Sequence, residues 1–600
     1  MHLKLSEERI ESFCGNVIPL WLEGDENLSQ KPIVWSCDAQ DVLLMRTFSH
    51  EKGVESAANG VLLTLMKAGN TVVTASLDGV EYRCEVCVRE MKRASADTPL
   101  EYYVGDFHDH LSTIHNHQLF AEREAGFPID LIRRIKEDER MDFAVISDHS
   151  STTNDRDFFL GFAEARREES EDAVILAGSE SEVTVVEEDR FGIPFKNSGE
   201  IVCVNSPQYR NTRSWEAFYQ LMEAAPYAIG VLAHPYIAGH VVKGIWNFSL
   251  NKNNGPELRH LIKGIESGNG GLRHANPINE YMYSIALDNG FRVSLTCSSD
   301  CHAPKWGYDI FPGKTVIMAY EKSKEAFLDA LLARRFYATE SGNVRVHYTV
   351  NGMGGASDLP LTDTYRFHVS ATLFHDDPTC IPTACRVISD YGKVVAEFEN
   401  EDFSDFDFEI RSESARYFYL RFTDAEGRRT WSCPVWTSRP IDAPAKKEYV
   451  PLNKEGFTVT ELESGKDASV LVNGNPLEKW TSELPSATYL IDMKEEKEFS
   501  ALGHYSPYVI RKECKELGID MCEFVALFVS KFEIATSSDG INFKTCAAGQ
   551  IRCFSGEEII SFAPQKARYI RFRAINTTGA EWRKQYADRP LWIAELSVFE

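Results

Sequence analysis

The 600-residue sequence lacks several features, and each absence excludes a class of protein. It has no excess of basic residues, because 90 Asp and Glu stand against 64 Lys and Arg, for a formal net charge of -26. A protein that tracks a nucleic-acid backbone needs clustered Lys and Arg, so we expect no nucleic-acid partner. It also has no apolar run long enough to cross a bilayer, so we expect no membrane insertion.

An N-terminal signal and a regular cysteine framework are also lacking. Residues 1–8 are polar and contain no apolar run of the kind found in secretory signals. The 14 Cys are scattered without repeated spacings, which favours reduced thiols over a disulfide scaffold. These absences together predict a cytoplasmic protein.

Two catalytic motifs are absent as well. The sequence contains neither a Gly-x-Ser-x-Gly nucleophile elbow nor a glycine-rich phosphate-binding loop. Any hydrolytic chemistry must therefore rest on other residues, and histidine and carboxylate are the candidates. Ten of the sixteen His lie between His108 and His302, about a third of the chain, so they are not randomly spread.

The stretch Asp106-Phe-His-Asp-His110 follows a strand-like run at residues 102–104. Side chains two residues apart on a strand point to the same side, so His108 and His110 would present two imidazoles to one metal ion. The same device returns at Asp300-Cys-His302, after a second apolar run at residues 291–296. The two motifs predict two sides of one metal site.

Further potential ligands also stand at the ends of predicted strands. These are Asp148-His149, Glu180 and His234. Ligand sites in parallel α/β proteins form at the carboxyl ends of the strands. A single histidine is more often a core or surface residue than a ligand, but several strand ends with this pattern predict a metal site.

Strand and helix patterns alternate between residues 100 and 342. Strands are expected at residues 142–147 and 173–177, and helices at 129–135 and 214–222. This alternation predicts a parallel sheet curled into a barrel. Short strands with turn signals predict β-sandwiches in the flanking parts of the chain. The expected domains are 1–95, 100–342, 343–440 and 450–600, with a linker after 440.

The ordered motifs of the central region are similar to those of the PHP (polymerase and histidinol phosphatase) superfamily. With the tail Phe336-Tyr-Ala-Thr, they most resemble its CehA/McbA-type metallohydrolases. The motifs are Gly105-Asp-Phe-His-Asp-His, Ile146-Ser-Asp-His149, Gly178-Ser-Glu180, Ala233-His-Pro235 and Ser299-Asp-Cys-His302. The resemblance implies a multidomain α/β plus all-β protein, in which β-sandwiches flank a distorted (β/α)7 PHP barrel. It also implies a metal centre that holds two or three divalent ions of Zn, Mn or Fe.

Position by position, the resemblance implies a set of metal ligands. They are His108, His110, His149, Glu180, His234, Asp300 and His302. At two positions the sequence departs from the pattern of these relatives, which leaves open whether a third metal ion binds. Asn116 stands where relatives often have Asp or His, so His115 or His117 is the candidate there, and Glu200 stands where many relatives have a histidine.

Other polar residues near these motifs are candidates for catalysis or substrate binding. Asp106 and Asp148 precede ligand histidines and are expected to orient them, although both could be plain strand-end carboxylates. Arg273 and His274 lie in a glycine-rich loop after the strand at 262–266 and are the favoured groups to bind a phosphate or protonate a leaving group. The candidates for substrate contact are Arg156, His240 and Lys305, although each of them, taken alone, is more typical of a solvated surface residue.

The two ends of the chain resemble known β-modules. Residues 1–95 are similar to bacterial Ig-like modules, and residues 450–600 to discoidin-like (F5/8 type C) carbohydrate-binding sandwiches. The second resemblance rests on Ala567-Arg-Tyr-Ile-Arg-Phe and the Ser-Asp-Gly turn at 538–540. It implies sugar binding through exposed aromatic residues, with a purely structural role as the alternative. The aromatic candidates are Trp582, Tyr586 and Tyr505.

The sequence therefore predicts a metal-dependent hydrolase that uses a metal-activated water. A phosphoesterase or phosphodiesterase is favoured, acting on a small-molecule or glycan-linked substrate such as a sugar-containing phosphate ester. Hydrolysis of a carbamate or carboxylic ester is the alternative within the same family. A carbohydrate-binding protein with an inactive barrel is the alternative from another class.

Overall fold

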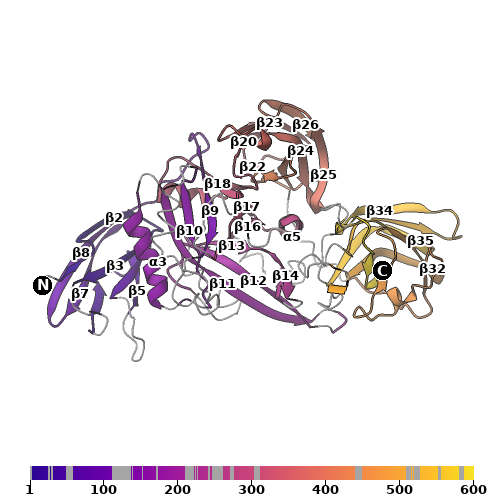
Figure 1. The fold of residues 1–600 in the computed structure, drawn as a ribbon, viewed down its shortest axis with the longest axis horizontal. Coiled ribbons are helices and arrows are strands. Elements are labelled where there is room, and N and C mark those ends of the chain that lie inside the picture. The colour runs from indigo at the N-terminus through magenta and orange to yellow at the C-terminus, as the bar shows by residue number, and fades with distance from the viewer. Residues whose placement is uncertain are drawn as a thin grey trace.

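A computed structural model describes most of the chain, and its element arrangement is shown in Figure 1. The described residues are 3–24, 28, 31–48, 59–110, 137, 140–151, 153, 155–170, 173–188, 190–192, 194–209, 220, 222, 225, 227–240, 243–245, 261–270, 276–302, 311–439, 449–507, 515–516, 518, 527–551, 556–579 and 587–600. Within them, no helix is both long enough and apolar enough to cross a membrane. Eleven cysteines in these ranges are free thiols.

The N-terminal part consists of two four-stranded sheets that pack face to face. The first sheet has the order β1 (Lys4–Leu5), β3 (Val17–Glu23), β6 (Gly60–Leu65) and β5 (Leu43–Phe48). The second has the order β2 (Arg9–Phe13), β8 (Val80–Arg89), β7 (Gly69–Leu77) and β4 (Val34–Cys37). Alternate residues of β7 and β8 are buried, so each strand sends one face inward, toward Leu20, Val61 and Leu63 of the first sheet.

The central sheet carries the sequence motifs. Its strands are β9 (Glu101–Asp109), β10 (Phe143–Ile146), β11 (Val174–Glu188), β12 (Pro194–Val204), β13 (Ile229–Ala233), β16 (Ile262–Asn269), β17 (Ser294–Ser298), β18 (Lys314–Ala319) and β19 (Phe336–Thr339). The order is β17-β16-β13-β12-β11-β10-β9-β18-β19. Pairing is parallel along β9-β10-β11 and β13-β16-β17, and antiparallel along β11-β12-β13 and β9-β18-β19.

The prediction of a distorted (β/α)7 barrel is wrong. The described residues contain 37 strands and only three α-helices: α3 (Asp155–Glu168), α5 (Asn276–Asp288) and α6 (Lys324–Leu332). The central strands belong to a mixed 15-stranded sheet that continues into the next part of the chain. The helix expected at 129–135 lies outside the described residues, as does most of the one expected at 214–222.

The antiparallel hairpin of β11 and β12 is one reason for the difference. These strands pair over eleven residues, from Gly178 opposite Val204 to Glu188 opposite Pro194. An antiparallel neighbour is reached by a tight turn, whereas a parallel neighbour needs a crossover that is usually a helix. Gly178 permits the close pairing, since a Cβ there would lie 1.8 Å from the carbonyl oxygen of Cys203. The β11–β12 hairpin is the long ribbon below the centre of Figure 1.

Residues 344–437 form one separate sheet and an extension of the central sheet. β20 (Val344–Val350), β21 (Met353–Gly354), β23 (Thr364–Leu373) and β26 (Phe406–Arg411) form the separate sheet. The central sheet continues from β19 into β28 (Arg429–Trp431), β27 (Tyr417–Asp424), β24 (Pro382–Ser389) and β25 (Lys393–Glu399). At its side, β29 (Val435–Thr437) pairs with both β27 and β22 (Asp358–Leu359). Arg421 fixes this part to α5 through hydrogen bonds of 2.8 Å to both carboxylate oxygens of Glu280.

The C-terminal part is a separate β-sandwich. Its larger sheet has the order β30 (Thr458–Glu461), β32 (Ala487–Ser506), β35 (Gly556–Thr577), β33 (Val529–Ser537) and β34 (Lys544–Gln550), with β37 (Glu595–Phe599) paired to β32. The smaller sheet pairs β31 (Trp480–Thr481) with β36 (Trp592–Ile593). Tyr505, one of the aromatic candidates for sugar binding, is 2% exposed and belongs to the core. Trp582 and Tyr586 lie outside the described residues.

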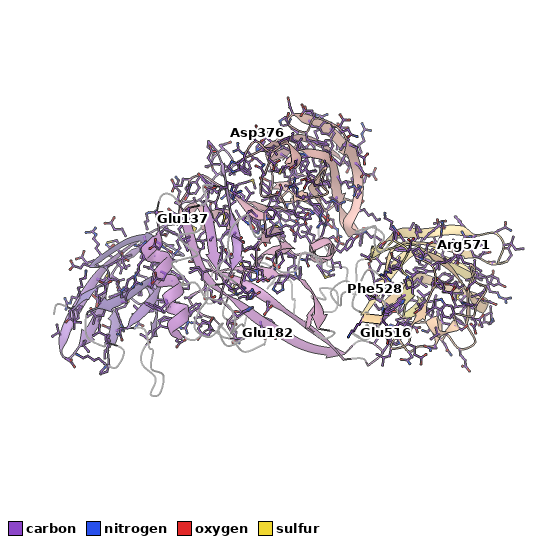
Figure 2. The ribbon with its side chains drawn as sticks, viewed as in Figure 1. Glu137, Glu182, Asp376, Glu516, Phe528 and Arg571 are labelled. Carbon is purple, nitrogen blue, oxygen red and sulfur yellow. The ribbon has the colours of Figure 1, made fainter. Side chains whose placement is uncertain are left out.

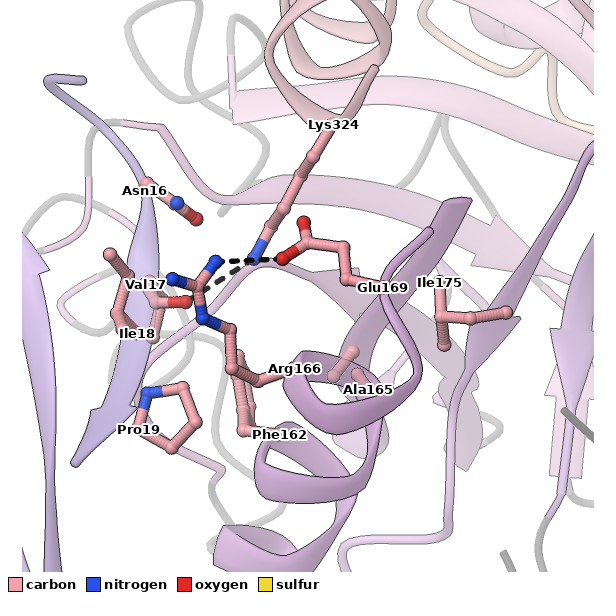
Figure 3. Close-up of a pocket in the computed structure, with 11 residues that line it drawn as sticks. Asn16, Val17, Ile18, Pro19, Phe162, Ala165, Arg166, Glu169, Ile175 and Lys324 are labelled. Carbon is pink, nitrogen blue, oxygen red and sulfur yellow. Dashed lines mark hydrogen bonds and ion pairs between the residues drawn. The ribbon is translucent and has the colours of Figure 1, made fainter. Parts of the chain in front are cut away.

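Polar contacts also join the N-terminal sandwich to the central part, around a small pocket between β3 and α3 (Figure 3). Arg166 of α3 donates to Glu169 at 2.8 Å and to Glu7 at 3.1 Å. Lys324, the first residue of α6, donates to the backbone oxygen of Val17 at 3.3 Å. The first sandwich is thus held to both helices of the central part that face it.

Candidate metal centre

Side chains from six places in the sequence meet at one end of the central sheet. His108 and His110 lie at the end of β9, His149 follows β10, Glu180 lies on β11, Glu200 on β12, His234 follows β13, and Asp300 and His302 follow β17. An isolated β-bridge joins Asp109 to Cys301 and another joins His149 to Glu180. The motifs that are distant in sequence are therefore adjacent in the fold.

The carboxylate of Glu180 lies at the centre of the cluster. Its Oε1 is 3.2 Å from His108 Nε2 and 3.1 Å from His234 Nε2. Its Oε2 is 2.7 Å from His149 Nδ1 and 3.5 Å from His110 Nε2. Glu180 is completely buried, so four imidazoles share one carboxylate away from solvent.

Asp300 and Glu200 extend the cluster on two sides. Asp300 Oδ1 is 3.2 Å from His110 Nε2 and 3.6 Å from His108 Nε2. Glu200 Oε2 is 3.4 Å from His234 Nε2, and its Oε1 is 3.7 Å from His149 Nδ1. These contacts place Glu200 among the other candidate ligands.

Pairs of imidazole nitrogens also face each other at short range. His110 Nε2 is 3.0 Å from His108 Nε2, and His149 Nε2 is 3.0 Å from His302 Nε2. His302 is anchored through its other ring nitrogen, which is 3.1 Å from the backbone oxygen of Asp300. Two ring nitrogens this close to each other can both bind one cation.

The donor set fits divalent metal ions. Three groups of donor atoms lie within 4.8 Å of one another: His110, His149 and His302; His108, His110 and Glu180; and His149, Glu180 and Glu200. Both oxygens of Glu180 and Oδ1 of Asp300 are buried and accept no hydrogen bond. Buried carboxylates without donors are costly unless they are paired or coordinate a metal, and mixed imidazole and carboxylate ligands suit Zn, Mn and Fe.

Two of the candidate ligands have strained backbones. His234 has a φ of 23° and Asp300 a φ of 48°, in the region that side-chain-bearing residues seldom adopt. Such a conformation costs on the order of 1–3 kcal/mol and persists where the surroundings enforce it. The His234 N–H donates to Glu266 Oε2 at 2.7 Å, and the Asp300 N–H donates to the backbone oxygen of His108 at 2.9 Å.

Glu266, which the sequence motifs did not single out, organises the layer behind the cluster. Its Oε1 lies 3.3 Å from His108 Nδ1 and accepts a hydrogen bond from Ser298 Oγ. Its Oε2 also accepts from Asn269 Nδ2 at 2.9 Å, and the same amide donates to Asp300 Oδ2 at 3.1 Å. Glu266 lies near the end of β16, and in sequence it lies between the motifs at residues 106–110 and 300–302. An acidic residue at a strand end was the signal that could have identified it.

Asp106 lies behind the cluster, where it contacts a backbone N–H and a lysine. Its Oδ1 accepts from the Ser299 N–H at 2.8 Å, and its Oδ2 pairs with Lys314 Nζ at 3.3 Å. Lys314 is fully buried and also donates to the backbone oxygens of Phe311 and Gly313. Burial and the nearby Asp106 raise the pKa of Asp109 well above its usual value. Asp148 is buried, and its backbone oxygen accepts from the Glu180 N–H at 3.0 Å.

Several predicted site residues are not placed. His115, His117, Arg273, His274 and Lys305 lie outside the described residues. Arg156 lies on α3 and His240 on β14 (Tyr236–His240), but their side chains are likewise outside the description. Their predicted roles in metal binding, catalysis and substrate binding stay predictions.

The electrostatics of the cluster follow from carboxylates packed against imidazoles. Burial disfavours a charged His149, but the Glu180 carboxylate outweighs this and raises the pKa of His149 to about 9. The same balance raises the pKa of His234 to about 10. Burial, followed by repulsion from Glu180, raises the pKa of Glu200 to about 7. Burial and neighbouring imidazoles lower the pKa of His110 well below its usual value.

Comparisons with known proteins concern another part of the prediction. No protein-family model and no curated protein matches the chain. Solved structures that resemble it include a family 32 carbohydrate-binding module from Clostridium perfringens in complex with GalNAc-β-1,3-galactose. It is 16% identical, with a TM-score of 0.20, and the match covers 25% of this chain and 100% of that one.

Two further modules match to a similar extent. The family 32 module of Clostridium perfringens NanJ, in complex with galactose, is 19% identical, with a TM-score of 0.19, over 25% of this chain and 98% of that one. The C-terminal domain of a chitobiase from Bacteroides fragilis is 17% identical, with a TM-score of 0.19, over 25% and 96%. At these TM-scores the matches carry no argument about function, and the PHP resemblance stays a prediction.

We expect Glu266→Gln to weaken metal binding by about 10- to 100-fold, because it removes the charge that orients His108 and Asn269. Titration with Mn²⁺ measures the change. Glu340→Gln is the matched control, because Glu340 forms a partly buried ion pair with Arg429 away from the cluster. Unchanged Mn²⁺ affinity in Glu266→Gln would contradict the assigned role.

We expect Mn²⁺ affinity to rise steadily between about pH 6 and pH 9. His149 and His234 are protonated in the metal-free protein below their raised pKa values, and Glu200 is half protonated near pH 7. An imidazole must lose its proton before it can ligate, so binding releases protons and is favoured by high pH. Calorimetry in buffers of different ionisation enthalpy counts these protons, and a pH-independent affinity would argue against ligation by these residues.

Proposed function

We propose that this protein is a metal-dependent hydrolase whose reaction centre is the cluster around Glu180. The observation that carries the proposal is the sharing of one fully buried carboxylate by His108, His149 and His234, at 2.7–3.2 Å. Each of these residues comes from a different strand end, so the fold assembles the donors at one place. A buried donor set of this size has a ready explanation in metal binding.

The buried and the partly exposed candidate ligands would have different roles. His108, His110, Glu180 and His234 are at most 4% exposed and would hold the ions at the floor of the site. His149, Glu200 and His302 are 19–23% exposed and form the side from which a substrate could approach. Divalent ions bound here would polarise a substrate oxygen and acidify a water molecule.

A phosphate ester or diester is the substrate class that we favour, and sugar-containing esters are included. The overlapping donor groups allow more than one cation, and paired cations suit phosphoryl displacement because they stabilise both the entering and the leaving oxygen. The same chemistry serves carbamates and carboxylic esters, which form the second substrate class. Substrate comparison therefore has to decide between them.

Carbohydrate binding by the C-terminal sandwich is the second candidate function. Its support is the discoidin-like sequence pattern of residues 450–600. The observed sheet of β30, β32, β35, β33, β34 and β37, with the small sheet of β31 and β36, agrees with that pattern. In this alternative, the cluster around Glu180 is catalytically idle and the protein's partner is a glycan. Galactose, which is bound in one of the similar structures, is the first sugar to test.

We expect Mn²⁺- or Zn²⁺-loaded protein to hydrolyse bis(p-nitrophenyl) phosphate or p-nitrophenyl phosphate faster than p-nitrophenyl acetate or an aryl carbamate. Asp300→Ala and His108→Ala should each lower kcat by about 10³-fold or more, because each removes a candidate metal ligand. Arg386→Met, which breaks an exposed ion pair with Glu397, should keep wild-type activity. Full activity in Asp300→Ala would refute the assigned site.

Metal content and galactose titration test the second candidate. The hydrolase proposal expects at least one tightly bound divalent ion per chain by elemental analysis. Less than one ion per chain, together with saturable binding of galactose and no turnover of the four esters, would favour the carbohydrate-binding protein. Calorimetry on the full-length chain measures the sugar binding, with glucose as the comparison.

A further inference from the structure

The tip of the β11–β12 hairpin is docked on the C-terminal sandwich through Arg190. Its Nε and Nη2 bind the two carboxylate oxygens of Glu557 at 2.5 and 2.6 Å, and Nη2 also donates to Ser597 Oγ at 2.6 Å. The guanidinium lies 3.9 Å from the ring centre of Phe191 and 5.1 Å from that of Phe599. A bidentate pair between aromatic rings is a specific contact, because the planar fork fixes its orientation.

The contact is only partly shielded from solvent, mainly on the Glu557 side. The side chain of Glu557 is 10% exposed and that of Arg190 is 31% exposed. Phe191 packs edge-on against the buried Tyr505 of β32, with ring centres 5.6 Å apart. A charge pair that is partly desolvated and flanked by rings is worth more than an exposed ion pair, and loss of one partner leaves the other charge uncompensated.

The same hairpin carries two candidate ligands near its other end. Glu180 lies opposite Val202, and Glu200 lies opposite Glu182, in the register of β11 and β12. Six residue steps, roughly 20 Å of strand, separate Glu182 from the last pair, Glu188 and Pro194. This outer part of the hairpin has only two strands, and a two-stranded ribbon is marginally stable by itself. The contact that holds the hairpin tip therefore also limits the movement of the strands near Glu180 and Glu200.

A second contact holds the sandwich to the central part. Gln550, at the end of β34, donates to Tyr281 Oη of α5 at 2.6 Å. Leu527, Phe528 and Trp592 join the apolar cluster that contains Tyr283 of α5 and Leu295 of β17. Phe528 lies on the side of the sandwich that faces the central part (Figure 2). The sandwich thus touches the central part at the hairpin tip and at α5, and acts as a brace between them.

We propose that Arg190 is a positioning residue for the metal centre: by tying the hairpin tip to Glu557, it holds the strands that present Glu180 and Glu200. The inference rests on the proposed metal centre and adds that the C-terminal sandwich is a structural part of it. The sandwich therefore has a role in the central site whether or not it binds a sugar.

The test compares Mn²⁺ affinity and the visible spectrum of Co²⁺-substituted protein in wild type and Arg190→Met. We expect Mn²⁺ binding to weaken by about 3- to 30-fold and the Co²⁺ bands to shift, because Glu180 and Glu200 lose their fixed geometry. The control is Arg568→Met, which removes an equally bidentate pair with Asp492 within the same sandwich, at 2.8 and 2.9 Å. It should leave both readouts unchanged.

A double-mutant cycle separates positioning from general destabilisation. Glu557→Gln should reproduce the loss seen in Arg190→Met, the two changes together should cost little more than either, and the exchange Arg190→Glu with Glu557→Arg should recover most of the affinity. Wild-type Mn²⁺ affinity and Co²⁺ spectrum in Arg190→Met would overturn the inference and leave the metal centre intact. A wild-type protein that takes up no Mn²⁺ would overturn the metal centre and this inference with it.

Discussion

The burial of one carboxylate among four imidazoles is the constraint on which the central part of this protein depends. Glu180 is removed from solvent and receives no hydrogen bond, while His108, His110, His149 and His234 all approach it within 3.5 Å. The folded chain tolerates this charge because the surrounding imidazoles, and the cations that we propose they bind, offset its desolvation. The strained backbones at His234 and Asp300 are a second cost that the same arrangement requires.

The layer behind the ligands explains how that arrangement is held. Glu266 fixes His108 and the His234 backbone, and Asn269 connects Glu266 with Asp300. Deeper still, the buried Lys314 neutralises Asp106. The rest of the fold braces the sheet from outside: Arg421 and Glu280 join it to the sheets of residues 344–437, and Arg190 and Glu557 join the long hairpin to the C-terminal sandwich.

The convergence of the candidate ligands was easier to predict than the fold around them, whereas their binding of metal stays a prediction. Alternation in the sequence predicted a barrel of repeated strand and helix units, whereas the described structure is a mixed sheet dominated by strands. Hydrophobic periodicity identifies a strand but does not say which neighbour it pairs with, so the return of the chain from β11 to β12 as a hairpin could not be read from it. The convergence of the side chains did not depend on that pairing, because β9, β10, β11, β13 and β17 still run in one direction and their carboxyl ends lie at one edge of the sheet.

The sequence by itself determined which donor types the chain carries and that His108 and His110 must share one side, because alternation along a strand is a local property. The roles of Glu266, Asp106 and Arg190 were decided only by the tertiary structure. Each acts through partners that are far away in sequence: His108 for Glu266, Lys314 for Asp106 and Glu557 for Arg190. Contacts of this kind leave no periodic or spacing signal in the chain, since only folding brings the partners together.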